Sequence, residues 1–383
     1  MPDATTVDPR KRVVLFTEES PLRLRGGDLL GPVEVAYETW GTLNEARDNA
    51  VFVAHALTGD SHASGTPASP GWWDTMVGPG KPVDTDRFFV ICPNLIGGCR
   101  GTTGPTAINP ATGQPYGLDF PIVEIADFVE VHRALLRHLG IERLLAGIGG
   151  SQGGMQILQW ALTAPEEIAH AVIVAATSRL SAQNIAFSAV ARSAIMRDPE
   201  FHDGRYTEMP FDPAHGTAGP RTGLAVARMM AHITYLSEEA MGEKFGRRFQ
   251  DGEEAARRLG VDFAVESYLQ HQGDTFLDRF DALSYLYLTR SLDYFDPFAE
   301  PGAIDLLAAS DTTALIVSFD SDWRFSTAHS RRVVRTLEQA GVPVTFREIS
   351  APHGHDSFLL DVPDYLATVR AYLDHAWEVR DAS

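Results

Sequence analysis

Cysteine is rare in this sequence, with Cys92 and Cys99 as the two examples among 383 residues. Two cysteines are too few for a disulfide framework or a structural zinc site, so we expect a reducing compartment, the cytoplasm. Long apolar runs are also absent: no stretch of about 18 uninterrupted apolar residues occurs, which predicts no membrane span. Residues 1–12 lack the apolar segment of a signal peptide.

Positive charge is in short supply as well. Lys and Arg number 32 against 51 Asp and Glu, which gives a formal net charge of -19 at pH 7. This balance argues against nucleic acid as a partner, because phosphate binding requires clustered Lys and Arg. A polyanionic small molecule would need a binding-site entrance lined by basic side chains or backbone amides, because the overall electrostatic field of the protein is negative. The hydrophobic content of 44% and charged content of 22% are those of a soluble globular protein.

One glycine-rich stretch organises the rest of the chain. Residues 144–150 are typical of a short apolar strand, and a turn and a helix follow them. Within the turn, Gly149-x-Ser151-x-Gly153 is the pattern of a nucleophile elbow, where a serine sits between strand and helix. Small neighbours are needed there because the strand and helix pass close together. The pattern predicts Ser151 as a nucleophile near the positive end of the helix.

The apolar pattern elsewhere predicts an α/β protein with a mostly parallel central sheet flanked by helices. Continuous apolar runs favour strands that are buried on both faces, at 50–54, 88–92, 144–150, 171–175 and 314–319. Amphipathic helices are predicted between them, at 122–139 and 328–339. The alternation over Val33–Thr39 favours a half-buried antiparallel strand. Together with the elbow, this order is that of the α/β-hydrolase fold.

The strand-helix rhythm breaks in the second half of the chain. From about residue 180 to 305 the sequence has helix-like stretches and loops but no convincing buried strand. We therefore expect a helical cap inserted into the core. The predicted segments are a first part of the core at 1–180, the cap or lid at 181–305 and a second part of the core at 306–383.

Two late loops offer the partners that a catalytic serine requires. In an α/β-hydrolase fold an acid and then a histidine follow the serine, each on a loop after a late strand. One such loop carries Asp320 and Asp322, and the next carries His353 and His355. A histidine would take the serine proton, and a carboxylate would orient the ring and stabilise its charged form. The residues alone leave both choices open.

The loop after the strand at 50–54 is the expected source of one oxyanion-hole amide, because this fold draws a donor from that position. We expect the backbone of Leu57 to provide it, with Ala56 and Thr58 as alternatives. The second amide would be that of Gln152, the residue after the nucleophile. The histidines of the same loop, His55 and His62, precede the serine and have no third ligand in suitable spacing, so structural roles are favoured.

A long loop at 93–121 is rich in Gly, Pro, Thr and Asn. A connection of this length usually lines a site or is disordered, and nearby aromatic residues favour the first interpretation. Its Cys99 is expected to be a small buried residue and not a reactive thiol.

Several longer motifs surround these candidates. They lie at 37–44 (Tyr-Glu-Thr-Trp-Gly-Thr-Leu-Asn), 55–59 (His-Ala-Leu-Thr-Gly), 97–105, 109–121, 149–156 and 354–360 (Gly-His-Asp-Ser-Phe-Leu-Leu). Over most of its length the chain therefore closely resembles the homoserine O-acyltransferase family of the α/β-hydrolase fold. The family usually has methionine after the nucleophile, where this chain has Gln152. Only a backbone amide is required there, so the difference leaves the resemblance intact.

The resemblance implies a role for particular side chains. The family's acid is the aspartate of a Ser-Asp-Trp stretch, here Asp322, and its base is the histidine of Gly-His-Asp, here His355. It also implies that Asp356 binds the amino group of homoserine, while the cap provides Arg228 and Tyr235 as an amino-acid clamp. Arg228 would hold the substrate carboxylate. In a helix these two residues, seven apart, would share one face.

The implied reaction is ping-pong acyl transfer. Ser151 would attack the thioester of an acyl-CoA, CoA would leave, and His355 would activate the homoserine hydroxyl against the acyl-enzyme. Acyl-CoA is then a co-substrate, and we expect neither a cofactor nor a metal. The resemblance also implies a homodimer assembled through the cap. A plain serine esterase of the same fold is the more remote alternative, although an esterase has no need for the clamp.

The acyl donor is predicted from Arg324, two residues after Asp322. Acetyl-transferring relatives commonly have an apolar residue there, whereas succinyl-transferring relatives resemble the Asp-Trp-Arg-Phe-Ser of this chain. A guanidinium can hold the distal carboxylate of a succinyl group in a dry pocket. We therefore expect succinyl-CoA as donor and acetyl-CoA as the alternative. In the competing interpretation Arg324 only pairs with a nearby carboxylate such as Asp320.

Overall fold

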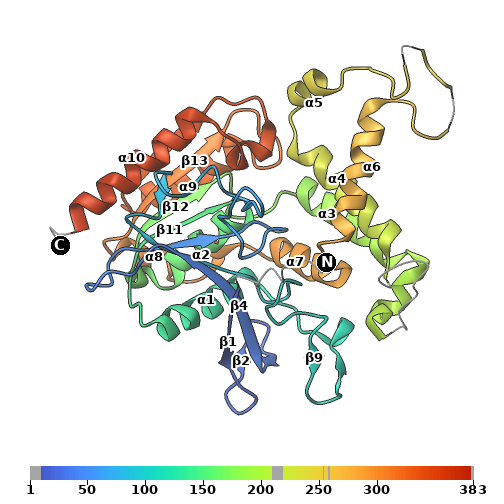
Figure 1. The fold of residues 1–383 in the computed structure, drawn as a ribbon. Helices are drawn as coiled ribbons and strands as arrows, with labels where there is room; N and C mark the ends of the chain where they lie inside the picture. Colours follow the sequence, from blue (N-terminus) through green and yellow to red (C-terminus); the bar gives the residue numbers. More distant parts are fainter. Residues whose placement is uncertain (1–9, 209–218, 253, 258, 381–383) are drawn as a thin grey trace.

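The computed structural model describes residues 10–208, 219–252, 254–257 and 259–380. Its centre is an eight-stranded sheet in the order β1-β4-β8-β5-β11-β12-β13-β14. The pairs β1–β4 and β4–β8 are antiparallel, and the remaining neighbours are parallel. Figure 1 shows this sheet between helices, with a further group of helices beside it. The α/β-hydrolase architecture predicted from the sequence is confirmed.

The strands of the central sheet follow the predicted apolar runs closely. They are β1 (Lys11–Phe16), β4 (Val33–Trp40), β5 (Ala50–Ala54), β8 (Phe89–Pro93), β11 (Leu144–Gly150), β12 (Ile168–Val174), β13 (Thr313–Phe319) and β14 (Val344–Ile349). Three small two-stranded sheets decorate the loops: β2 (Leu22–Arg23) with β3 (Leu29–Leu30), β6 (Val77–Gly78) with β7 (Val83–Asp84), and β9 (Ile108–Asn109) with β10 (Gln114–Pro115).

The helices divide between the faces of the sheet and the segment beside it. In chain order they are α1 (Ile125–Leu139), α2 (Gln152–Thr163), α3 (Ala182–Met196), α4 (Arg221–Tyr235), α5 (Glu238–Lys244), α6 (Ala264–Leu277), α7 (Ala282–Asp293), α8 (Ala303–Ala308), α9 (Thr327–Gln339) and α10 (Pro363–Val379). Short 3-10 turns occur at Gly117–Asp119, Pro165–Glu167, Pro199–Gly204, Tyr206–Glu208, Pro297–Ala299 and Gly354–Leu359.

Successive residues of a central strand face two different hydrophobic cores. In β5, Phe52 belongs to the core shared with α1, α2 and α9, whereas Val51 and Val53 belong to the core shared with α10. Figure 1 shows α10 above the sheet and α1 below it. Because both faces are covered, every position of β5 is buried, which explains its uninterrupted apolar sequence.

Strand β4 is more deeply buried than its alternating sequence predicts. The prediction of a half-buried strand was wrong for Ala36 and Glu38, which are buried together with their neighbours Val35 and Tyr37. Glu38 is covered by the loop after β5, from which Ser61 and His62 contact its carboxylate, whereas Ala36 is covered by the loop after β8, where its amide donates to the Thr102 hydroxyl. A glutamate is tolerated in this interior position because its oxygens have partners.

Helix α1 begins later than predicted, at Ile125 and not at Ile122. Glu124 forms its N-cap in extended conformation, and its backbone N–H donates to the Asp127 carboxylate. The end of the helix is as predicted, because Gly140 adopts the left-handed conformation with φ of 68° that suits the C-terminal cap.

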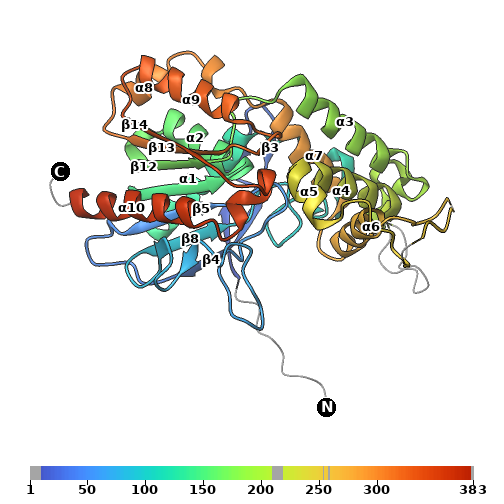
Figure 2. The ribbon, with the colours of Figure 1, turned by 90° about the horizontal axis from the view of Figure 1, so that it is seen from above.

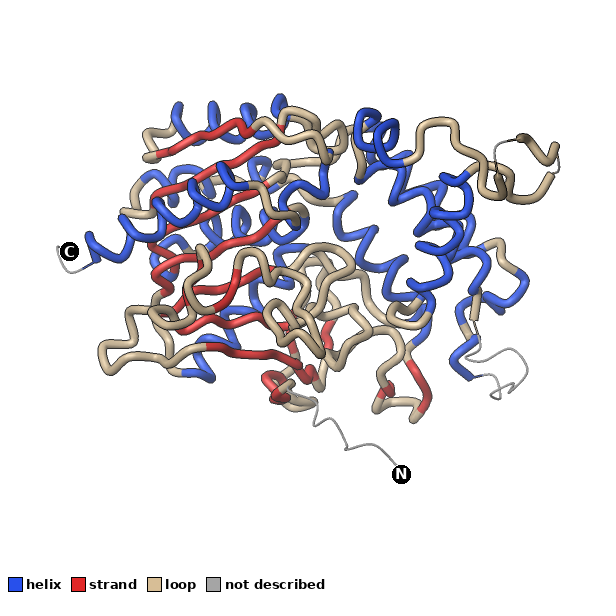
Figure 3. Tube along the Cα trace, turned by 45° about the horizontal axis from the view of Figure 1, so that its top comes forward, coloured by secondary structure: helices blue, strands red, loops and turns tan. Residues whose placement is uncertain are grey.

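Between β12 and β13 the described part of the chain adds no strand to the central sheet. Helices α3 to α7 instead gather at the carboxyl end of the parallel strands, and Figures 2 and 3 show this group to one side of the sheet, opposite the C-terminus. Residue 305, where the cap was predicted to end, lies within α8, which packs against α2 of the core. The segment covers the sheet edge where loops carry functional residues.

Both cysteines are unpaired. Cys92 lies buried in β8, whereas Cys99, which was expected to be buried, is half-buried in the long loop that follows. Over the residues described, we find no helix with both the length and the apolar character needed for a membrane crossing.

Candidate active site

The structure contains the predicted nucleophile elbow, with close backbone contacts at two of its glycines. Strand β11 ends at Gly150, α2 begins at Gln152, and Ser151 between them has φ of 58° and ψ of -123°. A Cβ atom on Gly153 would lie 2.0 Å from the Ala54 carbonyl oxygen, and one on Gly149 would lie 2.3 Å from the Gly153 carbonyl carbon. Any side chain at these two positions would therefore push the helix away from the strand.

The serine, the histidine and the acid lie within hydrogen-bonding distance of one another. The Ser151 Oγ is 2.8 Å from Nε2 of His355, and Nδ1 of His355 is 2.7 Å from Oδ2 of Asp322. All three side chains are buried. This is the arrangement in which a histidine can accept the serine proton while a carboxylate holds the ring in one tautomer.

The surroundings keep Asp322 ionised. Burial opposes its charged form, but the His355 ring and the backbone amides of Arg324 and Phe325 outweigh burial and lower the pKa of Asp322. Both amides donate to Oδ1 at 2.9 Å, which leaves Oδ2 for the histidine. The carboxylate is thus fixed in orientation as well as in charge.

The structure also separates the alternatives that the residues left open. Asp320 is exposed and accepts a hydrogen bond from the Ala351 amide, so it points away from the histidine that contacts Ser151. Of the two candidate histidines, His355 contacts the serine. His353 precedes the 3-10 turn at Gly354–Leu359 and is not among the residues of the serine cavity.

A cavity of about 190 Å³ opens above Ser151. The loop after β5, the α4–α7 segment and the loop after β14 all contribute to it. Its lining comprises Ala56, Leu57, Thr58, Gly59, Asp60, Trp72, Ser151, Arg228, His232, Tyr235, Arg279, His355, Asp356, Phe358 and Leu359. The cavity therefore lies between the core and the helices that cover it.

The three predicted clamp residues all lie in this cavity. Arg228 and Tyr235 share one face of α4, and the guanidinium carbon of Arg228 lies 5.7 Å from the centre of the Tyr235 ring. The Tyr235 ring is in turn 6.1 Å from that of His355. Burial raises the pKa of Asp356, although its electrostatic interactions with His355 and Arg228 oppose this effect.

A second arginine, which the sequence gave no reason to select, stands beside the first. Arg279 follows α6, and its guanidinium packs 5.2 Å from the Phe276 ring, while that of Arg228 packs 4.6 Å from the same ring. Burial, followed by the neighbouring charges of Arg228 and Arg100, lowers the pKa of Arg279. Neither Arg228 nor Arg279 forms an ion pair with any residue in the described ranges. Asp60 and Asp356 line the same cavity, so it presents both positive and negative side chains to a ligand.

Both arginines contact the loop that was predicted to supply an oxyanion-hole amide. Arg279 donates to the Thr58 carbonyl oxygen at 3.0 Å, and Arg228 donates to the Thr58 hydroxyl at 3.4 Å. Leu57, the favoured donor, lines the cavity together with its alternatives Ala56 and Thr58. The covering helices and this loop are thus joined by direct hydrogen bonds.

Gln152, the other predicted donor, is the first residue of α2 and is buried. Its side-chain amide donates to the Ser291 hydroxyl of α7 at 3.3 Å. The side chain thus faces the covering helices, and its backbone amide remains at the start of α2, beside Ser151.

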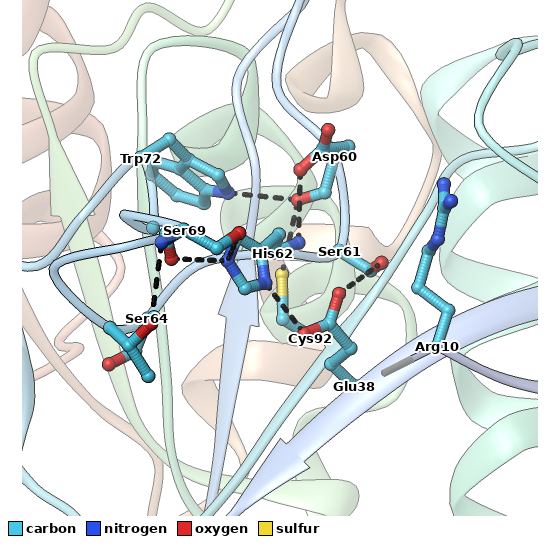
Figure 4. A network of polar contacts seen from close by, with 12 residues as sticks. Arg10, Glu38, Asp60, Ser61, His62, Ser64, Ser69, Trp72 and Cys92 are labelled. Carbon is cyan, nitrogen blue, oxygen red and sulfur yellow. Dashed lines mark hydrogen bonds and ion pairs between the residues drawn. The ribbon is translucent and has the colours of Figure 1, made fainter. Parts of the chain in front are cut away.

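A polar network anchors the same loop from below (Figure 4). The buried Glu38 accepts hydrogen bonds from the Ser61 hydroxyl at 3.2 Å and from Nδ1 of His62 at 2.8 Å. The Asp60 carbonyl oxygen accepts the indole N–H of Trp72 at 2.9 Å. His62 therefore serves the loop's structure in this arrangement, as does His55, whose Nε2 lies 3.0 Å from Oδ1 of Asn94.

Arg324 lies next to the triad acid but outside the lining of the serine cavity. Only 8% of the residue is exposed, and its guanidinium donates to the Thr234 hydroxyl at 2.6 Å and packs 5.4 Å from the Tyr235 ring. It forms no ion pair within the described part of the chain, Asp320 included. The interpretation of Arg324 as the partner of Asp320 was therefore wrong.

The long loop after β8, which was expected to line a site, does not reach the serine cavity. Two of its residues, Cys99 and Arg100, instead line a neighbouring cleft of about 320 Å³. Burial raises the pKa of Cys99 to about 11, which agrees with the expectation of an unreactive thiol.

Comparison with known proteins gives consistent matches over nearly the whole chain. A family model described as alpha/beta hydrolase fold matches residues 49–362. The homoserine O-succinyltransferase of Nocardioides sp. is 56% identical over 95% of this chain and 97% of its own length. The homoserine O-acetyltransferase of Mesorhizobium japonicum is 50% identical over 98% and 96% of the two chains.

Solved structures share the same architecture. The homoserine O-acetyltransferase from Bacillus anthracis superposes with a TM-score of 0.85 at 26% identity, covering 95% of this chain and 97% of that one. Esterase E22 superposes with a TM-score of 0.83 at 29% identity, covering 95% and 100%. These neighbours therefore include both acyl-transferring and ester-hydrolysing proteins.

Proposed function

Because the chain belongs to the homoserine O-acyltransferases of the α/β-hydrolase fold, we propose that it transfers a succinyl group from succinyl-CoA to the hydroxyl of L-homoserine. The observation that carries the acyl-transfer chemistry is the hydrogen-bonded arrangement of Ser151, His355 and Asp322 beneath an arginine-lined cavity. The product, O-succinylhomoserine, belongs to methionine biosynthesis.

The first half-reaction forms an acyl-enzyme. His355 accepts the proton of Ser151, whose oxygen attacks the thioester carbonyl, and the backbone amides of Leu57 and Gln152 hold the developing oxyanion. The carbon–sulfur bond then breaks, and the CoA thiolate leaves with the proton carried by His355. Asp322 stabilises the imidazolium during this step, which its lowered pKa favours.

The second half-reaction delivers the acyl group to the amino acid. Arg228 binds the α-carboxylate of homoserine, Asp356 binds the amino group, and Tyr235 closes the same face of the cavity. His355 takes the proton of the substrate hydroxyl, whose oxygen attacks the acyl-Ser151 carbonyl. The bond between the acyl carbon and Ser151 Oγ then breaks, His355 returns the proton to that oxygen, and the ester leaves. Filling the cavity with the amino acid displaces water from the acyl-enzyme, so that transfer outcompetes hydrolysis.

Arg324 supports succinyl over acetyl as the donor. A buried guanidinium without an ion-pair partner in the described ranges favours a ligand carboxylate, and the succinyl group provides one while the acetyl group does not. The Thr234 hydroxyl and the Tyr235 ring already fix the orientation of the guanidinium. Relatives with each of the two names match this chain, so overall identity does not distinguish the two donors.

The test is release of free CoA by the purified protein with L-homoserine and either succinyl-CoA or acetyl-CoA, with mass spectrometry of the product. We expect homoserine-dependent release that is faster with succinyl-CoA. Faster release with acetyl-CoA would leave the triad and clamp in place but contradict the role of Arg324. Release that does not depend on homoserine, together with rapid hydrolysis of a nitrophenyl ester, would identify an esterase.

A further inference from the structure

This inference rests on the proposed function, in which acyl-CoA is the donor. A protein with a net charge of -19 repels an anionic donor of this kind. The nucleotide part of CoA carries a pyrophosphate and a further phosphate, and a negative protein repels these groups unless local positive charge receives them. The serine cavity of about 190 Å³ holds the reacting end of such a donor but not its whole length. The phosphates must therefore bind outside it.

The cleft of about 320 Å³ next to the serine cavity has the required position. Arg279 lines both spaces, so the two adjoin at this residue. The walls of the cleft come from the start of α4, the turn between α6 and α7, and the loop after β8. A donor whose thioester lies at Ser151 can thus extend past Arg279 into the cleft.

Three arginines give this cleft its positive charge. Arg100 donates through Nε to the Arg279 backbone carbonyl at 2.9 Å, and Arg221 at the start of α4 completes the set. The side chains of Arg100 and Arg221 are 32% and 38% exposed, so both are accessible to a ligand from solvent. The lowered pKa of Arg279 reflects burial first and then the repulsion of Arg228 and Arg100. A bound anion would relieve this repulsion.

Among the described residues, three carboxylates lie near the cleft, and none of them forms a close ion pair with Arg100 or Arg221. Asp281 is turned into the protein, where it accepts hydrogen bonds from the Tyr206 hydroxyl at 2.7 Å and the Ser284 amide at 2.9 Å. Asp278 is 82% exposed and lies 3.7 Å from Arg221, and Asp60 lies 3.8 Å from Arg100. Both distances are long for an ion pair, and the Asp278 side chain is open to solvent, so these pairs can be exchanged for contacts with a phosphate.

We propose that the cleft between the start of α4, the α6–α7 turn and the loop after β8 binds the phosphate-bearing part of acyl-CoA, with Arg100 and Arg221 as its phosphate contacts. Arg279 forms the passage between the nucleotide and the reacting thioester. The binding is electrostatic, since guanidinium groups form charge-assisted hydrogen bonds with phosphate oxygens.

The test compares succinyl-CoA with succinyl-pantetheine, which carries the same thioester without the nucleotide. In Arg100→Gln and in Arg221→Gln, the KM for succinyl-CoA should rise by about tenfold, the value expected for one lost charge-assisted contact, with kcat unchanged. The KM for succinyl-pantetheine should stay at the wild-type value. Added salt should raise the KM for succinyl-CoA in the wild type and less so in the variants.

The matched control is Arg331→Gln, which removes an exposed arginine paired with Glu348 far from the cleft and should change neither KM. If both cleft variants lose succinyl-CoA and succinyl-pantetheine equally, or neither, the cleft does not bind the phosphates. Failure of the proposed function is a different result, because the wild type would then use neither thioester with homoserine. Nitrophenyl ester hydrolysis by each variant reports whether the serine site remains intact.

Discussion

The charge environment of individual residues bears on the proposed choice of acyl donor. Arg324 is buried and its guanidinium donates to a neutral hydroxyl, that of Thr234, and it forms no ion pair within the described residues. Burying a charge in this way is costly unless a ligand compensates it. The residue therefore favours an anionic substrate group over a neutral one.

The first prediction concerns this guanidinium. Arg324→Leu should lower kcat/KM for succinyl-CoA by at least about tenfold, because a charge-assisted contact to the distal carboxylate is lost. The same variant should leave kcat/KM for acetyl-CoA unchanged or increase it, because acetyl makes no such contact. The measurement is CoA release with each donor at saturating L-homoserine.

A suitable control for Arg324 is Asp320→Asn, which alters the nearest alternative carboxylate without touching the guanidinium. Its donor ratio should equal that of the wild type. An Arg324→Leu enzyme with an unaltered donor ratio would refute the assignment of Arg324 as the selector.

At the residue scale, sequence motifs identified side chains that lie close together in the fold. Ser151 lies in a local glycine pattern that is typical of a tight turn. The two late loops contain few aspartates and histidines, so the number of candidate partners was small. Choosing Asp322 over Asp320 required the family resemblance, because both follow the same strand. Arg279 could not be selected at all, since it lies in the cap without a motif and gains its position only when α6 packs over the Thr58 loop.

At the scale of elements, the contact between β11, α2 and β5 determines where the serine stands. The α2 backbone passes so close to β5 that the Cβ of any residue at position 153 would overlap the Ala54 carbonyl. Neither neighbour can yield easily, because β5 is paired on both sides within the sheet. The elbow is therefore rigid at both ends.

Gly153→Ala should consequently disable the enzyme. The added methyl group would displace the start of α2 and the Ser151 hydroxyl, and a displacement of about 1 Å costs on the order of 100-fold in rate. We expect that fall in kcat/KM together with a lower Tm, measured by CoA release and thermal unfolding.

Gly242→Ala is the matched substitution in α5. A Cβ atom there would meet nothing within 4 Å, and alanine is the better helix former by up to about 1 kcal/mol. Activity should be unchanged and the Tm equal or higher. Similar losses in both variants would show that glycine replacement as such, and not the close approach at the elbow, is responsible.

A comparison of predicted and observed strands shows which local sequence signals were sufficient to predict an element. The buried strands were predicted nearly to the residue because burial on both faces requires an apolar side chain at each position. The burial of β4 was underestimated because its covering layer is the loop that carries Ser61 and His62, whose position depends on a tertiary contact with Glu38. Sequence periodicity carries no information about a loop that folds back.

For the molecule as a whole, buried neutral histidines link stability to pH. Burial lowers the pKa of His132 to about 3 and that of His232 to about 3, and burial lowers the pKa of His170 to about 4. In the unfolded chain the same groups take up protons near pH 6.5. Between these values the unfolded state binds more protons, so folding stability falls as the pH falls below about 6.5.

We therefore expect these histidines to lower the Tm on acidification from pH 7 to pH 4, whereas Asp127, whose pKa is raised by burial to about 6, acts in the opposite direction. His132 alone contributes up to ~1.4 kcal/mol per pH unit in this range. His132→Gln should reduce the dependence of Tm on pH, because glutamine takes up no proton on unfolding. Calorimetric scans at several pH values provide the measurement.

His202→Gln is the control, since His202 is 40% exposed and pairs only loosely with Glu200 at 3.4 Å. Its pH dependence should match that of the wild type. A His132→Gln protein with an undiminished slope would show that other groups dominate acid unfolding.

The overall architecture could be predicted from the order of the apolar runs and from the elbow. The two clefts could not be predicted from the sequence. Each is assembled from segments more than a hundred residues apart, such as Arg100 and Arg279, and depends on how the covering helices settle on the core. The segment boundaries predicted at 181 and 305 say where the cap lies in the sequence. They do not say how its helices pack on the core.

The two thiols have a practical bearing on kinetics. Burial raises the pKa of Cys92 well above its usual value and that of Cys99 to about 11, so near neutral pH neither presents a thiolate to an aromatic disulfide reagent. The colour that such a reagent develops will come from liberated CoA alone. Enzyme and donor can then be mixed in comparable amounts, and a pre-steady-state burst before homoserine is added would count the competent serines directly.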